Sequence, residues 1–236
     1  MMKKVAFLFS GQGSAYTGMG KEFYDASPKA REIYGQAGEA FGFDVARMSF
    51  EGSNEELAQT KITQPVIYTL SMAAAACFAQ YCDQPFCVAG HSLGEYAALT
   101  YAGAMSLETG FAVIRRRAAA MQQAAETTSG CMFAIVGKDA ETIGAVCAQT
   151  PGYVVPVNYN SPVQTVIAGE TAPARLPLLL WRQGRARCST GREQRVPLQT
   201  DGGRGRAVCR GYPGPSVCAA QAAVLFQCDG RQSGTV

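Results

Sequence analysis

Apolar and polar residues follow strand and helix periods in turn along the first half of the chain. Short apolar runs that favour β structure predict buried strands at residues 5–9 and 86–89. Apolar side chains at helical spacing predict helices, which we place at residues 28–41, 62–82, 95–102 and 107–125. Because strands alternate with helices, we expect an α/β fold over residues 1–126, with a hydrolase-like parallel sheet as its core.

The pattern changes after Gly130. Apolar runs predict strands and one helix, in the order strand 132–136, helix 139–148, strand 154–158 and strand 165–168. Strand, helix, strand, strand in so short a space is half of a ferredoxin-like unit. We therefore expect a small, partial ferredoxin-like subdomain over residues 127–170.

The composition changes again from about residue 171. Residues 171–236 hold ten of the arginines and no lysine, against three acidic residues, so this segment has a formal charge of +7 within a chain of +3. Its many glycines and prolines interrupt any helix or strand period. We expect residues 171–236 to form an atypical, Arg/Gly/Pro-rich and poorly ordered tail.

The remaining composition argues against export, a membrane span and a metal site. The apolar run at residues 5–9 is too short for a signal peptide, and the run at 66–79 is shorter than the roughly 20 residues that cross a bilayer. Nine cysteines without zinc spacing and a single histidine, His91, predict free thiols and no bound metal. We expect a monomeric, cytoplasmic protein without a membrane partner.

The clearest chemical motif is Gly90-x-Ser92-x-Gly94, between a predicted strand and a predicted helix. Flanking glycines permit a strained turn that lifts a serine hydroxyl above the sheet, where amide groups face a developing oxyanion. We predict that Ser92 is a nucleophile, the alternative being a helix N-cap. His91 is a poor general base because adjacent side chains at such a turn point apart, so a packing role is favoured and no base is found.

Two further segments could belong to the same site as Ser92. Gly11-Gln12-Gly13-Ser14 follows the first strand, at the sheet edge where α/β folds build sites, and lacks a phosphate-loop lysine. Residues 115–117 are three arginines on a predicted helix, of which at most one or two face inward. An inward guanidinium would bind a carboxylate through two hydrogen bonds. The alternative is that the three arginine side chains lie in solvent and bind no ligand.

Together these segments resemble the malonyl-CoA:acyl carrier protein transacylase family and the acyltransferase domains of polyketide and fatty acid synthases. The resemblance covers residues 4–170. Its marks, in chain order, are Phe7-Leu8-Phe9-Ser10-Gly11-Gln12-Gly13-Ser14, Gly18-Met19-Gly20, Thr63-Gln64-Pro65, Gly90-His91-Ser92-Leu93-Gly94-Glu95-Tyr96, Arg117-x-x-x-Met121-Gln122, Asn158-Tyr159-Asn160-Ser161-Pro162 and Val166-Ile167-Ala168-Gly169. The order and number of these motifs make the match specific.

The resemblance implies an [acyl-carrier-protein] S-malonyltransferase. Ser92 would take malonyl from malonyl-CoA as an ester and pass it to the phosphopantetheine thiol of acyl carrier protein in fatty acid synthesis, with no bound cofactor. The backbone N–H groups of Gln12 and Leu93 would form the oxyanion hole, and Arg117 would bind the malonyl carboxylate. The residues that line the substrate pocket would be Arg117, Gln64 and Asn160.

One departure from the family is large. The family's general base is a histidine downstream of the small subdomain, and this chain has no histidine after position 91, so we expect impaired activity. Residues 225–230 can be encoded by bases that, one position later, read Tyr-Ser-Asn-Val-Thr-Gly, which resembles a family segment. We therefore hypothesise a change of reading frame near residue 171, and an intact single frame in the sequenced DNA, with no family-like alternative, would refute it.

Two other functions stay open. A serine esterase or hydrolase would share the serine turn, but Arg117 and the Gln12 loop argue against it. Acyl transfer to a carrier thiol, as opposed to release to water, separates these two. A non-catalytic protein could instead bind nucleic acid through its basic tail, with the salt sensitivity typical of such binding, although we expect no nucleic acid partner.

Overall fold

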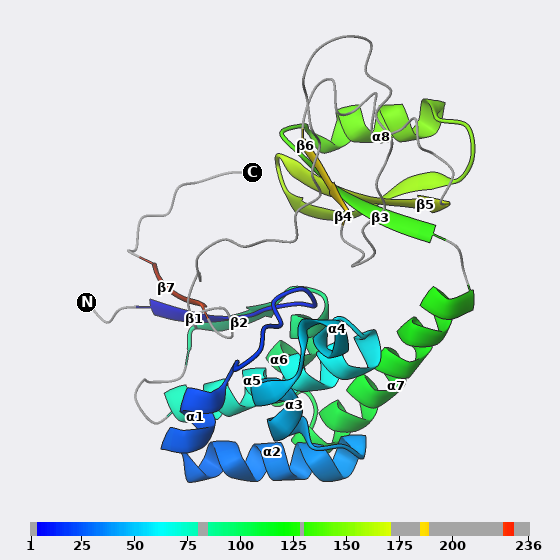
Figure 1. Ribbon diagram of the computed structural model, residues 1–236. Coiled ribbons are helices and arrows are strands. Elements are labelled where there is room, and N and C mark those ends of the chain that lie inside the picture. Colours follow the sequence, from blue (N-terminus) through cyan, green and yellow to red (C-terminus); the bar gives the residue numbers. More distant parts are fainter. Residues whose placement is uncertain (1–3, 80–84, 128–129, 171–184, 189–223, 229–236) are drawn as a thin grey trace, which may run out of the picture. The chain divides into compact units, whose positions relative to one another are not determined.

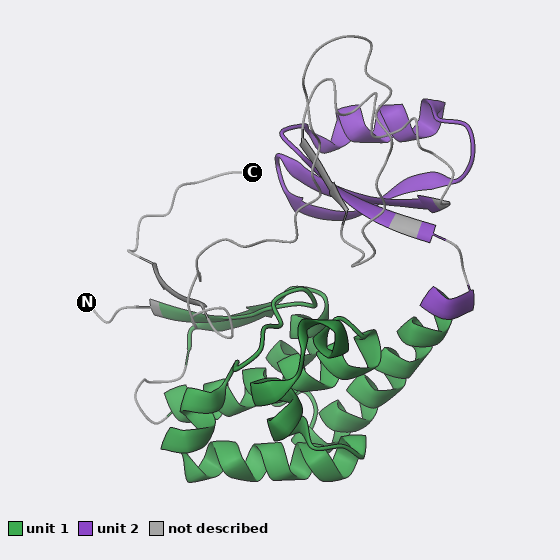
Figure 2. Ribbon diagram, in the orientation of Figure 1, with its two compact units in different colours: residues 1–124, 214–236 green, residues 125–213 purple. Residues whose placement is uncertain are grey.

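The computed structural model describes residues 4–79, 85–127, 130–170, 185–188 and 224–228. The chain divides into two compact units, one of residues 1–124 with 214–236 and one of residues 125–213 (Figure 2). Each unit has a sheet and a hydrophobic core of its own.

The sheet of the first unit has the strand order β2-β1-β7 (Figure 1). Strand β1, Lys4–Phe9, pairs in parallel with β2, Cys87–Gly90, so that Phe9 lies opposite Gly90. Strand β7, Val224–Cys228, pairs antiparallel with the other edge of β1. Because β1 and β2 are parallel, their carboxyl ends lie side by side, and the loop after Phe9 meets the turn after Gly90.

Seven described helices begin in this unit, and the last three residues of α7 belong to the second unit: α1 Lys21–Ala26, α2 Pro28–Phe41, α3 Val45–Glu51, α4 Asn54–Leu57, α5 Thr60–Phe78, α6 Leu93–Tyr101 and α7 Leu107–Thr127. Helix α6 lies against β1 and β2, and α5 packs against both α6 and α2 (Figure 1). Helix α5 is buried along most of its length because its residues are apolar or small. Even α5 and α7, the longest of the described helices, lack an apolar stretch that could span a membrane.

Aromatic contacts fix α6 on the sheet. The rings of Phe7 and Phe9 on β1 lie 5.1 and 6.1 Å from the ring of Tyr101, at the end of α6. Phe7 and Phe9 are almost completely buried, and buried aromatic side chains supply a large share of a core's stabilisation. The start of α6, and with it the turn that precedes the helix, is therefore held in a defined place above β1 and β2.

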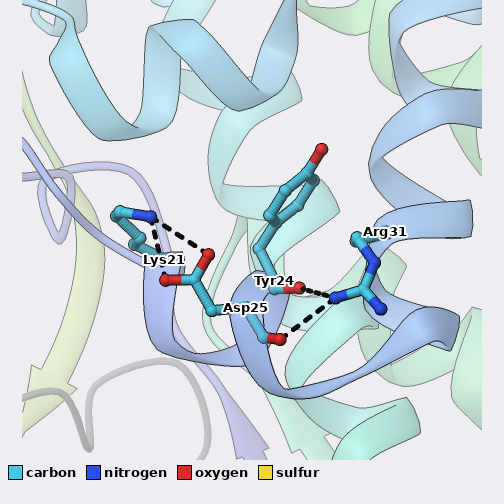
Figure 3. Close-up of polar contacts among 4 residues, drawn as sticks. All are labelled: Lys21, Tyr24, Asp25 and Arg31. Carbon is cyan, nitrogen blue, oxygen red and sulfur yellow. Dashed lines mark hydrogen bonds and ion pairs between the residues drawn. The ribbon is translucent and has the colours of Figure 1, made fainter.

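Polar contacts join α1 to α2 (Figure 3). Arg31 Nη1 donates hydrogen bonds to the carbonyl oxygens of Tyr24 at 2.8 Å and Asp25 at 3.0 Å. These carbonyls end α1 and have no partner within that helix, so Arg31 of α2 satisfies them from outside. Within α1, Lys21 forms an exposed ion pair with Asp25.

In the described residues of the second unit, a four-stranded antiparallel sheet with the order β4-β5-β3-β6 is accompanied by one helix. Its elements are β3 Gly130–Val136, α8 Ala140–Gln149, β4 Val154–Ser161, β5 Gln164–Glu170 and β6 Arg185–Cys188. Ile143 and Cys147 of α8 form the core with Ile135, Val154 and Ile167 of the strands. Burial raises the pKa of the Cys147 thiol.

The α/β fold and the partial ferredoxin-like arrangement confirm the expectation from the sequence. The helix predicted at 28–41 has those bounds in the structure. Three short helices, α1, α3 and α4, were not predicted, although two carry readable start signals: Asp44 caps α3, and Ser53 and Glu56 form a capping box on α4. Two described strands, β6 and β7, lie in the segment expected to be a tail, and the remainder of that segment lies outside the described residues.

Candidate active site

Ser92 occupies a strained turn between β2 and α6. Its φ is 53° and its ψ is −103°, and it is the one non-glycine residue with a positive φ in the described part of the chain. Such a conformation costs about 1–3 kcal/mol and persists only where neighbouring contacts impose it. The turn is closed by hydrogen bonds from Gly94 N to His91 O at 3.0 Å and from Glu95 N to Ser92 O at 3.2 Å.

The glycines that flank Ser92 are required by close backbone packing. A Cβ added to Gly90 would overlap the backbone of Gly94, and a Cβ added to Gly94 would overlap the carbonyl of Phe9. The start of α6 therefore crosses the ends of β1 and β2 at a distance that no larger residue permits. This explains the motif physically: both glycines let the helix approach the sheet edge while the serine is lifted above it.

Arg117 of α7 lies against Ser92. Its Nη2 donates a hydrogen bond to Ser92 Oγ at 3.0 Å, and its guanidinium carbon lies 5.4 Å from the centre of the Tyr96 ring. Its Nη1 is buried and has no hydrogen-bond partner. A buried N–H donor without an acceptor is costly, which marks this nitrogen as one that a ligand would satisfy.

The two arginines that precede Arg117 do not share this position. Arg115 and Arg116 are exposed, and Arg115 Nη1 reaches only the Ala40 carbonyl, at 3.3 Å. Successive residues of a helix point about 100° apart, so one member of the run faces the serine and the others face away.

Gln64 connects the first glycine-rich loop with α7. Its side chain is completely buried on α5, and its Nε2 donates to Gln12 Oε1 and to Met121 Sδ, both at 3.1 Å. Gln12 Nε2 in turn donates to Thr60 Oγ1 at 3.0 Å. The Oε1 of Gln64 is buried without a partner. Since Met121 lies one turn after Arg117, this network holds the loop and the arginine-bearing helix together.

The two amides predicted to form an oxyanion hole both belong to this region. Leu93 is the first residue of α6, where N–H groups have no acceptor within the helix, and Gln12 lies in the loop after β1. Among the described residues, neither backbone N–H has a protein acceptor. The loop also packs tightly on the serine turn, because a Cβ on Gly11 would lie 2.6 Å from His91 O.

No side chain described in the structure takes the place of a general base at Ser92. Adding a Cβ to Gly11 would bring it to 2.8 Å from His91 Nδ1, so the His91 ring lies against the first loop. Glu95 is exposed on α6. The described residues also contain no cluster of three or more His, Cys, Asp or Glu that could hold a metal ion.

Asn160 belongs to the other unit. It lies near the end of β4, is exposed, and its Nδ2 donates to Gln164 Oε1 at 3.1 Å. Five of the six residues predicted for the site thus lie in the first unit around Ser92, and the role of Asn160 in substrate binding stays a prediction.

Tyr96 and Met121 stand within the motifs of the resemblance, but the sequence assigned no role to them or to Thr60. A signal for Tyr96 was present, because it stands four residues after Ser92 on a predicted helix and so shares a face with it. Thr60 and Met121 depend on how α5 and α7 pack, which no local pattern encodes.

A serine on a strained strand-to-helix turn, between two glycines that let the helix approach the sheet edge, is typical of α/β proteins with a serine nucleophile. The family model for the acyl transferase domain matches residues 6–188 of the chain. The chain belongs to this acyl transferase domain family. The matched segment runs 18 residues beyond residue 170, where the resemblance in the sequence ends.

Curated relatives agree with the family. The chain is 37% identical over 204 residues to the malonyl CoA-acyl carrier protein transacylase of Bacillus subtilis strain 168, which covers 85% of this chain and 62% of the relative. It is 36% identical over 200 residues to the protein of the same name from Escherichia coli strain K12, covering 84% and 63%. The chain thus spans less than two thirds of the length of these relatives.

Solved structures show the same fold. An acyl carrier protein S-malonyltransferase from Vibrio cholerae superposes with a TM-score of 0.72 at 35% identity, covering 78% of this chain and 62% of that one. The corresponding enzyme from Burkholderia pseudomallei gives a TM-score of 0.71 at 41% identity, covering 77% and 60%. A malonyl-transacylase solved in complex with a type II polyketide synthase acyl-carrier protein gives 0.72 at 33% identity.

Proposed function

We propose that this chain carries the malonyl-binding and nucleophilic part of a malonyl-CoA:acyl carrier protein transacylase. Ser92 Oγ attacks the malonyl thioester, the C–S bond breaks, and CoA leaves as its thiol with the proton that the serine gives up. The phosphopantetheine thiol of acyl carrier protein then attacks the ester and restores the serine. The names of the curated relatives and of the similar structures support these two substrates.

The observation that carries the proposal is the hydrogen bonding of the two terminal guanidinium nitrogens of Arg117. One guanidinium nitrogen is bonded to Ser92 Oγ at 3.0 Å, and the other is buried without a partner. In a malonyl ester of Ser92, the free carboxylate is two bonds from the acyl carbon. It would accept a hydrogen bond from that nitrogen and neutralise the guanidinium charge. An acetyl group has no carboxylate and would leave the guanidinium unpaired, which costs about 3–5 kcal/mol where the charge is fully buried.

The amides of Gln12 and Leu93 take the second role, stabilisation of the oxyanion. An amide donor aimed at the tetrahedral intermediate is worth about 10²–10³ in rate. The side-chain bond between Gln64 and Gln12 supports this by fixing the first loop beside the serine turn. No cofactor takes part in the proposed reaction.

Among the described residues, no side chain takes the role of a general base beside Ser92. After His91 the sequence contains no histidine to accept the Ser92 proton. General-base catalysis contributes about 10²–10⁴ in rate, so we expect loading and transfer by residues 1–236 alone to be slower by about that factor than in a transacylase that has such a base. We place the protein in the cytoplasm as a monomer, where free malonyl-CoA and acyl carrier protein would meet it.

A chase experiment tests the function. The chain is incubated with malonyl-CoA, freed of excess CoA ester, and mixed with phosphopantetheinylated acyl carrier protein, and the intact masses of both proteins are followed. Malonyl should leave the chain and appear on the carrier protein. Release of free malonate without transfer would instead identify a hydrolase, and absence of any loading would reject the proposal.

A further inference from the structure

The guanidinium of Arg117 lies over the ring of Tyr96, and this contact is independent of the bond to Ser92. The ring centre is 5.4 Å from the guanidinium carbon, within the range of a cation–π interaction. Tyr96 stands one helical turn after Ser92, so α6 presents the serine hydroxyl and the aromatic ring on the same side. Helix α6 therefore holds Arg117 of α7 at two points.

Arg117 needs such an anchor because its side chain is long and has many rotamers. An arginine loses about 2 kcal/mol of side-chain entropy when it is fixed in one conformation. Substrate binding is weakened by this amount unless the folded protein already holds the side chain in that conformation. The neighbouring Arg116 shows the alternative, since its side chain is exposed. A guanidinium that already lies in its binding position offers its N–H groups to a ligand at a lower cost in free energy.

The kind of anchor matters as much as its presence. A carboxylate partner would neutralise Arg117 and compete with an incoming carboxylate for the same N–H groups. The ion pairs of the described residues are Lys21–Asp25 and Lys29–Glu32, so Arg117 is not held in this way. An aromatic face attracts the cation but leaves the N–H groups in the guanidinium plane available, which agrees with the unpartnered Nη1.

We propose that Tyr96 is a positioning residue for substrate selection: its ring orients Arg117 so that the free Nη1 and the serine-bonded Nη2 meet the carboxylate of a carboxylated acyl group. The proposal rests on the proposed function and names the residue that makes its specificity possible. The contact with Arg117 is made by the ring of Tyr96, so the ring and not the hydroxyl should hold the guanidinium in place.

The test compares Tyr96→Phe with Tyr96→Leu. Loading rates with malonyl-CoA and acetyl-CoA are measured for each, and thermal unfolding reports on folding. Tyr96→Phe keeps the ring and should keep the malonyl-to-acetyl ratio. Tyr96→Leu should lower that ratio about tenfold, through slower malonyl loading with an unchanged acetyl rate. In an Arg117→Ala background Tyr96→Leu should have no further effect on the ratio.

Other outcomes are as informative. An unchanged ratio in Tyr96→Leu, or an equal loss for both substrates, would overturn the positioning role. So would an additive effect with Arg117→Ala. If the parent chain loads no acyl group, the proposed function fails separately, and NMR titration with malonate and acetate still measures whether Tyr96→Leu weakens carboxylate binding about tenfold where Tyr96→Phe does not.

Discussion

Gly94 at the start of α6 lies directly against the carbonyl group of Phe9 at the end of β1, with no room between them for a Cβ atom. This contact brings α6 over the ends of two parallel strands and so sets the height of Ser92 above the sheet. Gly94→Ala should push helix and strand apart and destabilise the chain by about 1–3 kcal/mol, as overpacking usually does. Urea unfolding followed by circular dichroism measures the change.

Gly35 supplies the matched control for that variant. It lies within α2, is exposed, and would place a Cβ in open space. Gly35→Ala should stabilise the chain by up to about 1 kcal/mol, because alanine has a higher helix propensity than glycine. Equal effects of the two substitutions would show that the close approach at Gly94 has no energetic weight.

Arg117→Ala removes the proposed partner of the substrate carboxylate. Loading with malonyl-CoA should fall about 100-fold or more, whereas loading with acetyl-CoA should stay the same or rise, since no carboxylate contact is lost there. Arg116→Ala is the control, because its side chain is exposed one position away. A similar loss in both variants would point to the helix as a whole, and the proposed selectivity would have no support.

Gln64→Leu tests the network between the first loop and α7. The substitution removes the bonds to Gln12 and Met121 but also the buried, unpartnered Oε1, so the free energy of unfolding should change by less than about 1.5 kcal/mol. The loading rate should nevertheless fall about tenfold or more, since the Gln12 amide loses its support. Mass spectrometry of quenched loading reactions measures the rate, and denaturant unfolding of the same sample measures the stability, so the two effects are separated. An unchanged loading rate would remove Gln64 from the site.

The second unit should respond to acid through Asp139. Its carboxylate caps α8 by accepting from Thr142 N at 2.7 Å, and this backbone hydrogen bond lowers the pKa of Asp139. A carboxyl whose pKa is lower in the folded state stabilises the fold above its ordinary pKa of about 3.9, and the contribution is lost as the pH falls through the lower, folded value.

Asp139→Asn keeps a capping oxygen that does not titrate. Thermal unfolding of this variant should therefore depend less on pH between about 5 and about 2 than that of the parent chain. Glu141→Gln, which changes an exposed carboxyl in the first turn of the same helix, is the comparison. The capping role would be contradicted by parallel pH profiles of Asp139→Asn and the parent.

Local pattern was enough to predict the parts of this site that short-range geometry controls. The turn at Ser92 follows from two glycines between a strand and a helix, and the positive φ of 53° is where such a turn places its central residue. Helical spacing limited the inward arginine to one or two of three. The family resemblance, in contrast, was needed to select Arg117 and to suggest Gln64.

Contacts that depend on how helices pack could not be read from the sequence. The Tyr96 ring meets Arg117 only because α6 and α7 lie together, and Gln64 reaches Met121 across α5 and α7. The short helices α3 and α4 were missed because four to seven residues show too little periodicity, although Asp44 and Ser53 marked their starts.

Peptide mass spectrometry after exposure to malonyl-CoA tests the central claim most directly. The malonyl group should be found on the peptide that contains Ser92, should be absent from Ser92→Ala, and should exceed the acetyl group loaded from acetyl-CoA under the same conditions. A malonyl group attached at another residue, or retained in Ser92→Ala, would contradict the assignment of Ser92 as the acyl-carrying residue.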